Sequence, residues 1–282
     1  MLGPVKFGVH LPQSGPAASA LAIEQVALQA EELGFDDVWV SDHVILPEDA
    51  AYPPSSYILE PLVALTWAAA TTRSIGLGTT VLVLPLRPPV LLAKMLASLD
   101  LMSNGRLIVG AASGWLKQEF DALGVPFAER GARSNEAIAL LRQCWRDDPI
   151  DFQAEVTGAT LVAMRAKPQP QREIPIWVGG HSEPAFRRAV ALGNGWHGAF
   201  QSPEKTAPMT RRLRRDRPEL SFTLSMRASW DALRDEPGEI RRQLEQYQEA
   251  GIQHIVAEPL QRDADAWMQC AEAFARVFEP YR

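Results

Sequence analysis

Hydrophobic and polar positions follow two alternating patterns along the whole chain. Short, continuously apolar runs such as Leu107–Ala112 are typical of parallel strands buried on both faces. Longer segments with apolar residues three or four positions apart, such as 267–281, are typical of helices packed through one face. The expected strands are residues 5–11, 37–40, 75–84, 107–112, 176–178, 196–200, 220–228 and 254–256.

A helical pattern follows each expected strand, and the connections are short. Eight such strand–helix units in one chain predict an α/β protein with a (β/α)8, or TIM, barrel. A doubly wound open sheet is the alternative. Residues 152–164 read as a hairpin inserted into this architecture. No repeat or linker is evident, so we expect residues 1–282 to form a single domain.

The segment 74–120 organises the prediction because it contains two strands and the helix between them. Glycines at 76 and 78 interrupt the first strand, which is typical of a distortion or of close approach by a ligand. The helix carries one apolar stripe, made of Leu91, Leu92, Met95, Leu96, Leu99 and Met102. The two strand ends should bring Thr79-Thr80-Val81 close to Ser113-Gly114-Trp115.

Composition narrows the possible partners and the compartment. The chain has 282 residues and a formal net charge of −6, which argues against nucleic acid or an anionic membrane surface as a partner. Cys144 and Cys270 lie among apolar residues of helical segments, as expected for buried thiols of a reducing compartment. No apolar stretch has the ~20 residues of a membrane span. We therefore expect a cytoplasmic protein that acts on a small molecule.

In a (β/α)8 barrel, the functional residues lie where strands end and helices begin. Six such places carry polar or glycine residues in this chain. They are His10 to Gln13, Ser41 to His43, Thr79 to Val81, Ser113 to Trp115, Gly179 to Ser182, and Trp196-His197.

Asp42 and His43 directly follow the second strand and are the best candidates for catalysis. An imidazole can accept or donate a proton near neutral pH, and a neighbouring carboxylate can orient a ring or a ligand. Alternatively, Asp42 caps a turn and His43 is a structural histidine. No second histidine or cysteine lies at metal-ligand spacing, so we expect no metal site. The Gly-x-Ser-x-Gly motif of many hydrolases is also absent.

Gly179-Gly180-His181-Ser182 ends the fifth expected strand and leads into a helix. Unpaired N–H groups at a helix N-terminus, approached through glycines, can bind a phosphate. The same residues are equally compatible with a simple tight turn that ends in an N-cap serine.

Four segments together resemble the luciferase-like monooxygenase superfamily. They are AEELGFDDVWVSDHV, EPLVALTWAAATTRSIGLGTTVLVLPLRPP, LDLMSNGRLIVGAASGWLKQEFDALGVPFAERG and PIWVGGHSEPAFRRAVALGNGW. The resemblance covers most of the chain up to about residue 200 and is closest to the branch that uses the deazaflavin coenzyme F420. It implies a barrel with an inserted segment, a homodimer, and F420 or FMN as cofactor.

The resemblance also assigns roles to individual residues. His43 matches the proton donor or acceptor of alcohol- and sugar-oxidising members, and Asp42 is expected at the ring edge. A cis peptide between Thr80 and Val81 would shape the ring. The expected cofactor-binding residues are Asp42, Thr79, Thr80, Val81, Ser113, Gly114, Trp115, Gly179, Gly180, His181 and Ser182. The expected substrate residues are His10, Gln13, Trp39, Trp196 and His197.

One departure concerns the substrate. Sugar-phosphate dehydrogenases of this family carry carboxylates where this chain has Gln13 and Trp115, which argues against a sugar-phosphate substrate. Trp115 and Trp39, with their Leu and Val neighbours, suit a more apolar or aromatic substrate. The sequence thus predicts an F420-dependent oxidoreductase that transfers a hydride. The alternatives are an FMN-dependent monooxygenase supplied by a separate reductase, and a cofactor-binding protein without catalysis.

Overall fold

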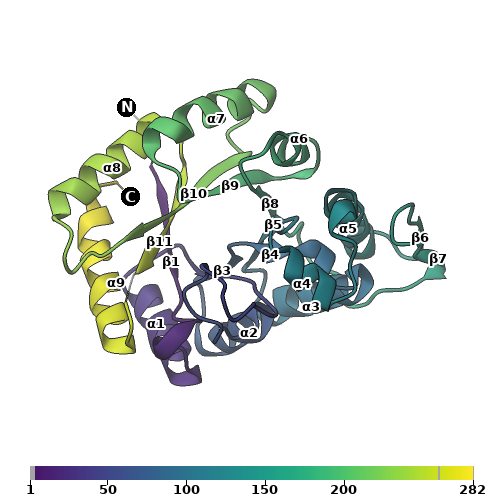
Figure 1. Ribbon diagram of the computed structural model, residues 1–282, viewed down its shortest axis with the longest axis horizontal. Helices are drawn as coiled ribbons and strands as arrows, with labels where there is room; N and C mark the ends of the chain where they lie inside the picture. The colour runs from purple at the N-terminus through teal and green to yellow at the C-terminus, as the bar shows by residue number, and fades with distance from the viewer. Residues whose placement is uncertain (1–3, 260, 282) are drawn as a thin grey trace.

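Eight parallel strands close into a barrel in the computed structural model, which describes residues 4–259 and 261–281 (Figure 1). They are β1 (Lys6–His10), β2 (Asp37–Val40), β3 (Gly76–Thr79), β5 (Leu107–Ala112), β8 (Ile176–Gly179), β9 (Gly195–Ala199), β10 (Thr223–Trp230) and β11 (His254–Pro259). Pairing of β1 with β11 and of β3 with β5 closes the ring. The predicted (β/α)8 barrel is therefore confirmed, and the open-sheet alternative is wrong.

Helices cover the outside of the barrel. They are α1 (Ala20–Glu32), α2 (Pro61–Thr71), α3 (Pro89–Met102), α4 (Lys117–Ala122), α5 (Arg130–Arg146), α6 (Glu183–Leu192), α7 (Pro203–Asp216), α8 (Pro237–Glu249) and α9 (Ala264–Phe278). Ser19 and Asp263 cap α1 and α9 by accepting backbone N–H bonds. None of the helices in the described part of the chain is long and apolar enough to cross a membrane.

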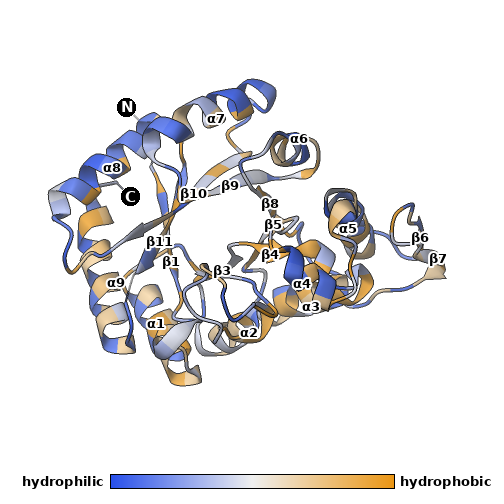
Figure 2. Ribbon diagram, in the orientation of Figure 1, coloured by the Kyte–Doolittle hydropathy of each residue, from blue (hydrophilic) through white to orange (hydrophobic). Residues whose placement is uncertain are grey.

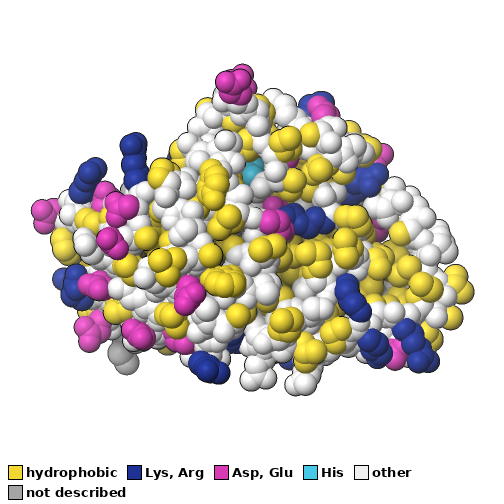
Figure 3. All heavy atoms as spheres, turned by 90° about the horizontal axis from the view of Figure 1, so that it is seen from below, with side chains coloured by type: hydrophobic (Ala, Val, Ile, Leu, Met, Phe, Trp, Pro, Cys, Tyr) yellow, Lys and Arg dark blue, Asp and Glu magenta, His cyan; other side chains and the backbone are white. Residues whose placement is uncertain are grey.

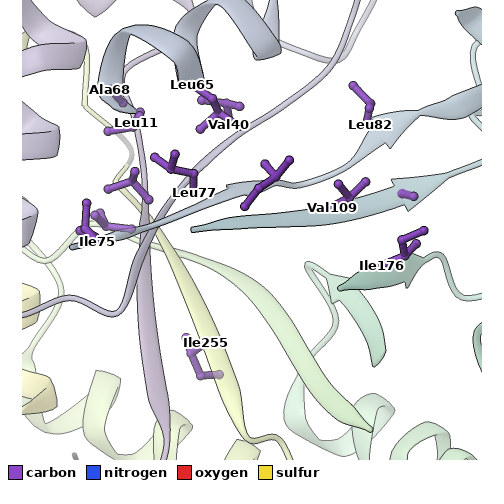
Figure 4. Packing of buried hydrophobic residues seen from close by; sticks show 14 of the residues in the cluster. Leu11, Val40, Leu65, Ala68, Ile75, Leu77, Leu82, Val109, Ile176 and Ile255 are labelled. Carbon is purple, nitrogen blue, oxygen red and sulfur yellow. The ribbon is translucent and has the colours of Figure 1, made fainter. Parts of the chain in front are cut away.

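The hydrophobic core lies between the strands and these helices. Leu65 and Ala68 of α2 point toward Val40 and Leu77 on the barrel wall (Figure 4). Amphipathic and apolar helices differ visibly in Figure 2, where α7 and α8 are largely hydrophilic and α2 and α3 are much more hydrophobic. Cys144 and Cys270 are buried free thiols, as predicted.

The apolar stripe predicted on α3 is only partly buried. Leu92 and Leu96 are fully buried, but Leu91 is 56% exposed and Met102 is 74% exposed. The apolar residues of α3 cover more of the helix circumference than the barrel can bury, so a second apolar face points outward. Figure 3, which views the molecule from below Figure 1, shows hydrophobic side chains gathered over much of this side.

Two irregular features agree with the sequence analysis. The peptide bond between Thr80 and Val81 is cis, as predicted, and a short strand β4 (Leu82–Val83) follows it and pairs with β5. The inserted hairpin is β6 (Ile150–Gln153) with β7 (Thr160–Met164), which lies beyond α5 at the edge of the molecule (Figure 1).

Aromatic side chains occupy much of the barrel interior. Trp39 is fully buried there and packs against both Trp177 and His197. Side chains at Gly8 or Gly78 would collide with the Trp39 indole, so both positions must lack a Cβ. Glycines on β1 and β3, the two strands that flank β2, thus leave space for the Trp39 indole.

Candidate active site

A cavity of about 870 Å³ opens at the carboxyl ends of the strands. This is the end of a (β/α)8 barrel at which active sites lie. It is lined by most of the predicted site residues: His10, Gln13, Ser41, Asp42, His43, Thr80, Val81, Ser113, Gly114, Trp115, Gly179, Gly180, His181, Ser182 and His197. Segments from strands far apart in the sequence therefore meet at one rim, as predicted.

Three predicted site residues do not line this cavity, and their assignment is corrected. Thr79 is fully buried and donates a hydrogen bond to the Gly110 carbonyl. Trp39 fills the barrel interior, and Trp196 is buried with its indole N–H donated to the Gly180 carbonyl at 2.8 Å. Strand residues alternate in direction, so not every residue near a strand end faces the cavity.

His43 lies at the cavity beside a buried carboxylate. Its Nδ1 is 3.2 Å from Glu119 Oε2, and Glu119 is only 2% exposed. Glu119 also accepts the backbone N–H of Val44 at 2.5 Å, which fixes the carboxylate in place. Donation of Nδ1–H to Glu119 leaves the His43 Nε2 lone pair for a ligand, so His43 can serve as a general base and, once protonated, as a general acid.

The Asp42 carboxylate accepts hydrogen bonds from other residues of the protein. Its two carboxylate oxygens accept hydrogen bonds from the Arg87 guanidinium at 2.6 and 2.9 Å, and one also accepts the Val83 N–H. Burial raises the pKa of Asp42, while the bonds from Arg87 and Val83 act in the opposite direction. Asp42 therefore fastens the loop after β2 to the segment after the cis peptide, directly beside His43.

Gln13 and His10 hold the first two strand ends together. The Gln13 amide donates to the carbonyls of Ser41 and Leu59 and accepts the Ser41 N–H at 2.6 Å. His10 Nδ1 lies 2.8 Å from the Leu11 carbonyl, which requires a proton on Nδ1, and Nε2 lies 2.8 Å from Ser41 Oγ. Burial, aided by the charge of Arg227, lowers the pKa of His10 to about 4.

This neutral, buried histidine makes stability depend on pH. Between pH 6.5 and pH 4 the unfolded chain binds a proton at His10 that the folded protein does not. The free energy of unfolding should therefore fall as the pH falls through this window, with His10 contributing up to about 3 kcal/mol. Urea unfolding of a His10→Asn variant, which cannot titrate, should show a smaller loss; an unchanged slope would contradict the assignment.

A buried ion pair forms part of the cavity floor. Arg227 donates to Glu258 at 2.5 and 3.1 Å and, through Nη1, to Ser41 Oγ and the Thr80 carbonyl. Burial acts to raise the pKa of Glu258, but the Arg227 charge and hydrogen bonds outweigh it and lower the pKa to about 2. The pair thus stays charged and ties β10 and β11 to the ends of β2 and β3.

Another part of the cavity lining carries positively charged side chains. Arg188 is only 8% exposed and donates to Asn135 and to the Gly131 carbonyl. Among residues 4–259 and 261–281, no carboxylate lies within ion-pair distance of Arg188 or Arg130, and both line the cavity. The N-terminus of α6 opens beside them after Gly180, whose φ of +114° favours glycine. Backbone N–H groups and two guanidinium groups form a site suited to an anion.

Aromatic rings form the outer wall. Trp115 lies edge-on to His43, with ring centroids 6.0 Å apart, and Tyr52 lies between Trp115 and Phe200 at 6.4 Å from each. The Arg227 guanidinium lies 4.9 Å from the Phe200 ring centroid. A flat or apolar ligand would find large contact surfaces here.

Sequence analysis missed five charged residues of the site: Glu119, Arg130, Arg188, Arg227 and Glu258. The last two strands were expected to end at residues 228 and 256, but they end at Trp230 and Pro259. Arg227 and Glu258 are charged residues within largely apolar strands, and this pattern could have identified them as residues of the cavity floor. Within the described residues, no three His, Cys, Asp or Glu side chains are grouped so as to hold a metal ion.

Comparison with known proteins identifies the family. Residues 4–273 match the luciferase-like monooxygenase family, so the chain belongs to that family of (β/α)8 barrels. An uncharacterised protein of Mycobacterium tuberculosis is 30% identical over 210 residues, which are 70% of this chain and 72% of that protein. The F420-dependent glucose-6-phosphate dehydrogenase of Kineococcus radiotolerans is 34% identical over 198 residues, covering 68% of this chain and 56% of the dehydrogenase.

Solved structures share the fold at low sequence identity. An F420-dependent secondary alcohol dehydrogenase in complex with an F420–acetone adduct has a TM-score of 0.81 at 18% identity, with 99% of each chain covered. The monooxygenase RslO1 of Streptomyces bottropensis has a TM-score of 0.79 at 21% identity, covering 98% of this chain and 99% of that one.

Proposed function

We propose that this protein is a coenzyme F420-dependent oxidoreductase that transfers a hydride between the deazaflavin and a small organic substrate. Membership of the luciferase-like monooxygenase family and similarity to an F420-dependent dehydrogenase support this function. The observation that carries the proposal is one cavity lined both by an anion site and by the His43–Glu119 pair.

The residues of the cavity fit such a cofactor. Arg188, Arg130 and the N-terminus of α6 would hold its phosphate. A Cβ at Gly179 would lie 2.8 Å from a Val81 methyl group, so the glycine keeps the space beside the Thr80–Val81 peptide open. The backbone of this peptide and the Arg227–Glu258 floor would support the ring.

The protein's own contribution to the reaction is position and a proton. A bound deazaflavin supplies the hydride chemistry. Glu119 holds His43 in one orientation, so that Nε2 can accept a proton from a substrate hydroxyl or return it in the reverse direction. Trp115, Tyr52 and Phe200 would exclude water from one side of the substrate and favour an apolar or aromatic alcohol or carbonyl compound.

Titration of the purified protein with oxidised F420 and with FMN tests this function. Cofactor and protein fluorescence report binding, and F420 should bind more tightly than FMN. Tighter binding of FMN would favour a monooxygenase supplied by a separate reductase. Binding of neither cofactor would overturn the proposal.

Arg188 should contribute strongly to that affinity. Arg188→Met removes a buried guanidinium from the anion site, and a charge-assisted hydrogen bond is worth about 1.5–3 kcal/mol, or roughly 10- to 100-fold in Kd. Arg187→Met is the matched control, because Arg187 is the next residue on α6, is 67% exposed, and does not line the cavity. Equal affinities of the two variants would place the phosphate elsewhere.

We also propose that two copies of the chain pair through α2 and α3. Val63 and Trp67 lie one turn apart on α2 and are 66% and 47% exposed, and Leu91 and Met95 lie one turn apart on the adjacent α3. An apolar face on two neighbouring helices suits a self-complementary interface between identical subunits.

The mass in solution, measured by light scattering, tests this interface. The wild-type protein should be a dimer, and a Trp67→Glu/Met95→Glu variant should be a monomer, because the interface would have to bury two charges. Leu220→Glu is the control, since Leu220 is 76% exposed but lies away from both helices. A monomeric wild type, or a double variant that remains dimeric, would contradict the proposed interface.

A further inference from the structure

A continuous column of polar side chains crosses the barrel interior from the cavity to the opposite end. Thr80 Oγ1 lies 2.8 Å from His197 Nε2, and His197 Nδ1 lies 2.8 Å from Ser225 Oγ. Ser225 Oγ lies 2.8 Å from His254 Nδ1, and His254 Nε2 lies 2.9 Å from Asp37 Oδ1. All five residues are at most 5% exposed. Bulky aliphatic residues usually fill this space in (β/α)8 barrels, so the column needs an explanation.

Aromatic rings hold both imidazoles of the column in place. Trp39 is stacked on His197 with an angle of 4° between the rings and 5.1 Å between the centroids. Trp177 lies edge-on to His254 at 5.0 Å. Close packing on both histidines prevents the rings from rotating, so their nitrogen atoms keep the same partners.

The hydrogen bonds of the column must all point in the same direction. The Asp37 carboxylate accepts the Trp39 indole N–H, and it also accepts the N–H of His254 Nε2. When His254 is neutral, its Nδ1 accepts from Ser225, the Ser225 oxygen accepts from His197 Nδ1, and His197 Nε2 accepts from Thr80. One additional proton on His254 leaves its bond to Asp37 unchanged and reverses the three bonds between His254 and Thr80, so that the Thr80 hydroxyl points its hydrogen toward the cavity.

The charged and titratable groups near the column differ between its two histidines. His254, Arg227 and His181 are the groups whose charge acts on His197, and burial with these charges keeps the pKa of His197 well below its usual value. The remaining carboxylate at the base, that of Asp36, accepts the Phe7 N–H at 2.8 Å. His254 is in direct contact with the Asp37 carboxylate, whereas the hydrogen-bond partners given for His197 are the hydroxyls of Thr80 and Ser225.

We propose that this column is a proton relay, with Thr80 as its entrance from the cavity and His254 as its store. A proton leaves an N–H or O–H group of the bound ligand, which keeps the electron pair, and joins the Thr80 oxygen as the Thr80 proton moves to His197 Nε2. The Nδ1 proton of His197 moves to Ser225, and the Ser225 proton moves to His254 Nδ1. The ligand loses one proton and His254 gains one, beside the carboxylate of Asp37. Only the identity of that ligand rests on the proposed function.

Nuclear magnetic resonance of the cofactor-free protein, labelled with 15N-histidine, tests the relay directly. The pH is lowered in steps, within the range in which the protein stays folded, so that His254 gains its second proton. At the same pH midpoint, the proton of His197 should move from Nδ1 to Nε2. In Ser225→Ala, His254 should still titrate, but His197 should no longer follow it. Thr206→Val removes a buried hydroxyl outside the column and should leave the coupled transition intact.

Two results would overturn the relay. One is a His197 tautomer that stays fixed while His254 titrates, and the other is a His254 that keeps one protonation state throughout this range. Because the measurement needs no cofactor, either result leaves the F420 proposal standing. Failure of the protein to bind F420 would likewise leave the relay unaffected.

Discussion

Replacing His43 with alanine is expected to lower kcat by about 10²- to 10⁴-fold, the usual contribution of a general acid or base. The substitution removes an imidazole that contacts both the Trp115 ring and the buried carboxylate of Glu119. Cofactor affinity should not change, because the anion site is formed by other residues of the cavity, Arg188, Arg130 and the N-terminus of α6. Steady-state kinetics on a panel of alcohols, together with F420 titration, measures both quantities.

Glu119→Gln is the companion variant. The amide can still accept the backbone N–H bonds of Val44 and Ile45 but cannot stabilise a cationic His43. We expect a lower kcat with little change in KM, because Glu119 acts through His43. Wild-type turnover in His43→Ala would reject the catalytic role. A loss confined to KM in Glu119→Gln would reject its positioning role.

Arg87→Met is expected to destabilise the protein by about 3–5 kcal/mol, which is typical for the loss of one partner of a buried ion pair. Asp42 is 4% exposed and would keep only the Val83 N–H as a partner of those described here. Without Arg87, burial would raise the pKa of Asp42 further. Protonation of Asp42 removes the unpaired charge, so the deficit in the free energy of unfolding should shrink as the pH falls.

Two further variants make this prediction specific. An Arg87→Met/Asp42→Leu double variant should regain much of the lost stability, because no buried charge remains. Lys117→Met removes one partner of an exposed pair with Asp121, whose side chains are 63% and 56% exposed, and should cost less than about 1 kcal/mol. Chemical unfolding measures all three variants. Equal losses for Arg87→Met and Lys117→Met would show that the Asp42–Arg87 pair does not stabilise the fold.

The sequence allowed prediction of the barrel and of most of the cavity because both depend on local patterns. Buried parallel strands are continuously apolar, and the residues that follow them face the cavity wherever a glycine or a polar residue ends the strand. His43, Gly180 and Trp115 were found in this way. The Thr80–Val81 cis peptide was found through family resemblance and not from any local pattern.

The remaining features depend on contacts between distant segments. Asp42 looked free to contact a ligand, but Arg87, 45 residues later, occupies both of its oxygens. Trp39 looked like a cavity residue, but its direction on β2 turns it into the barrel. Glu119 meets His43 only because the loop after β5 folds back over the loop after β2. Pairings of this kind leave no periodic signal in one sequence.

The place of Trp39 in the barrel has a consequence for how these sequences diverge. While the indole remains, a methyl group at position 8 or position 78 has no space. A relative that carries a small residue at position 39 would be released from the restriction at position 78, whereas a Cβ at position 8 would still collide with the Asp37 carboxylate. Positions 39 and 78 should therefore change together across descendants of a common ancestor, and position 8 should follow only where residue 37 changes as well.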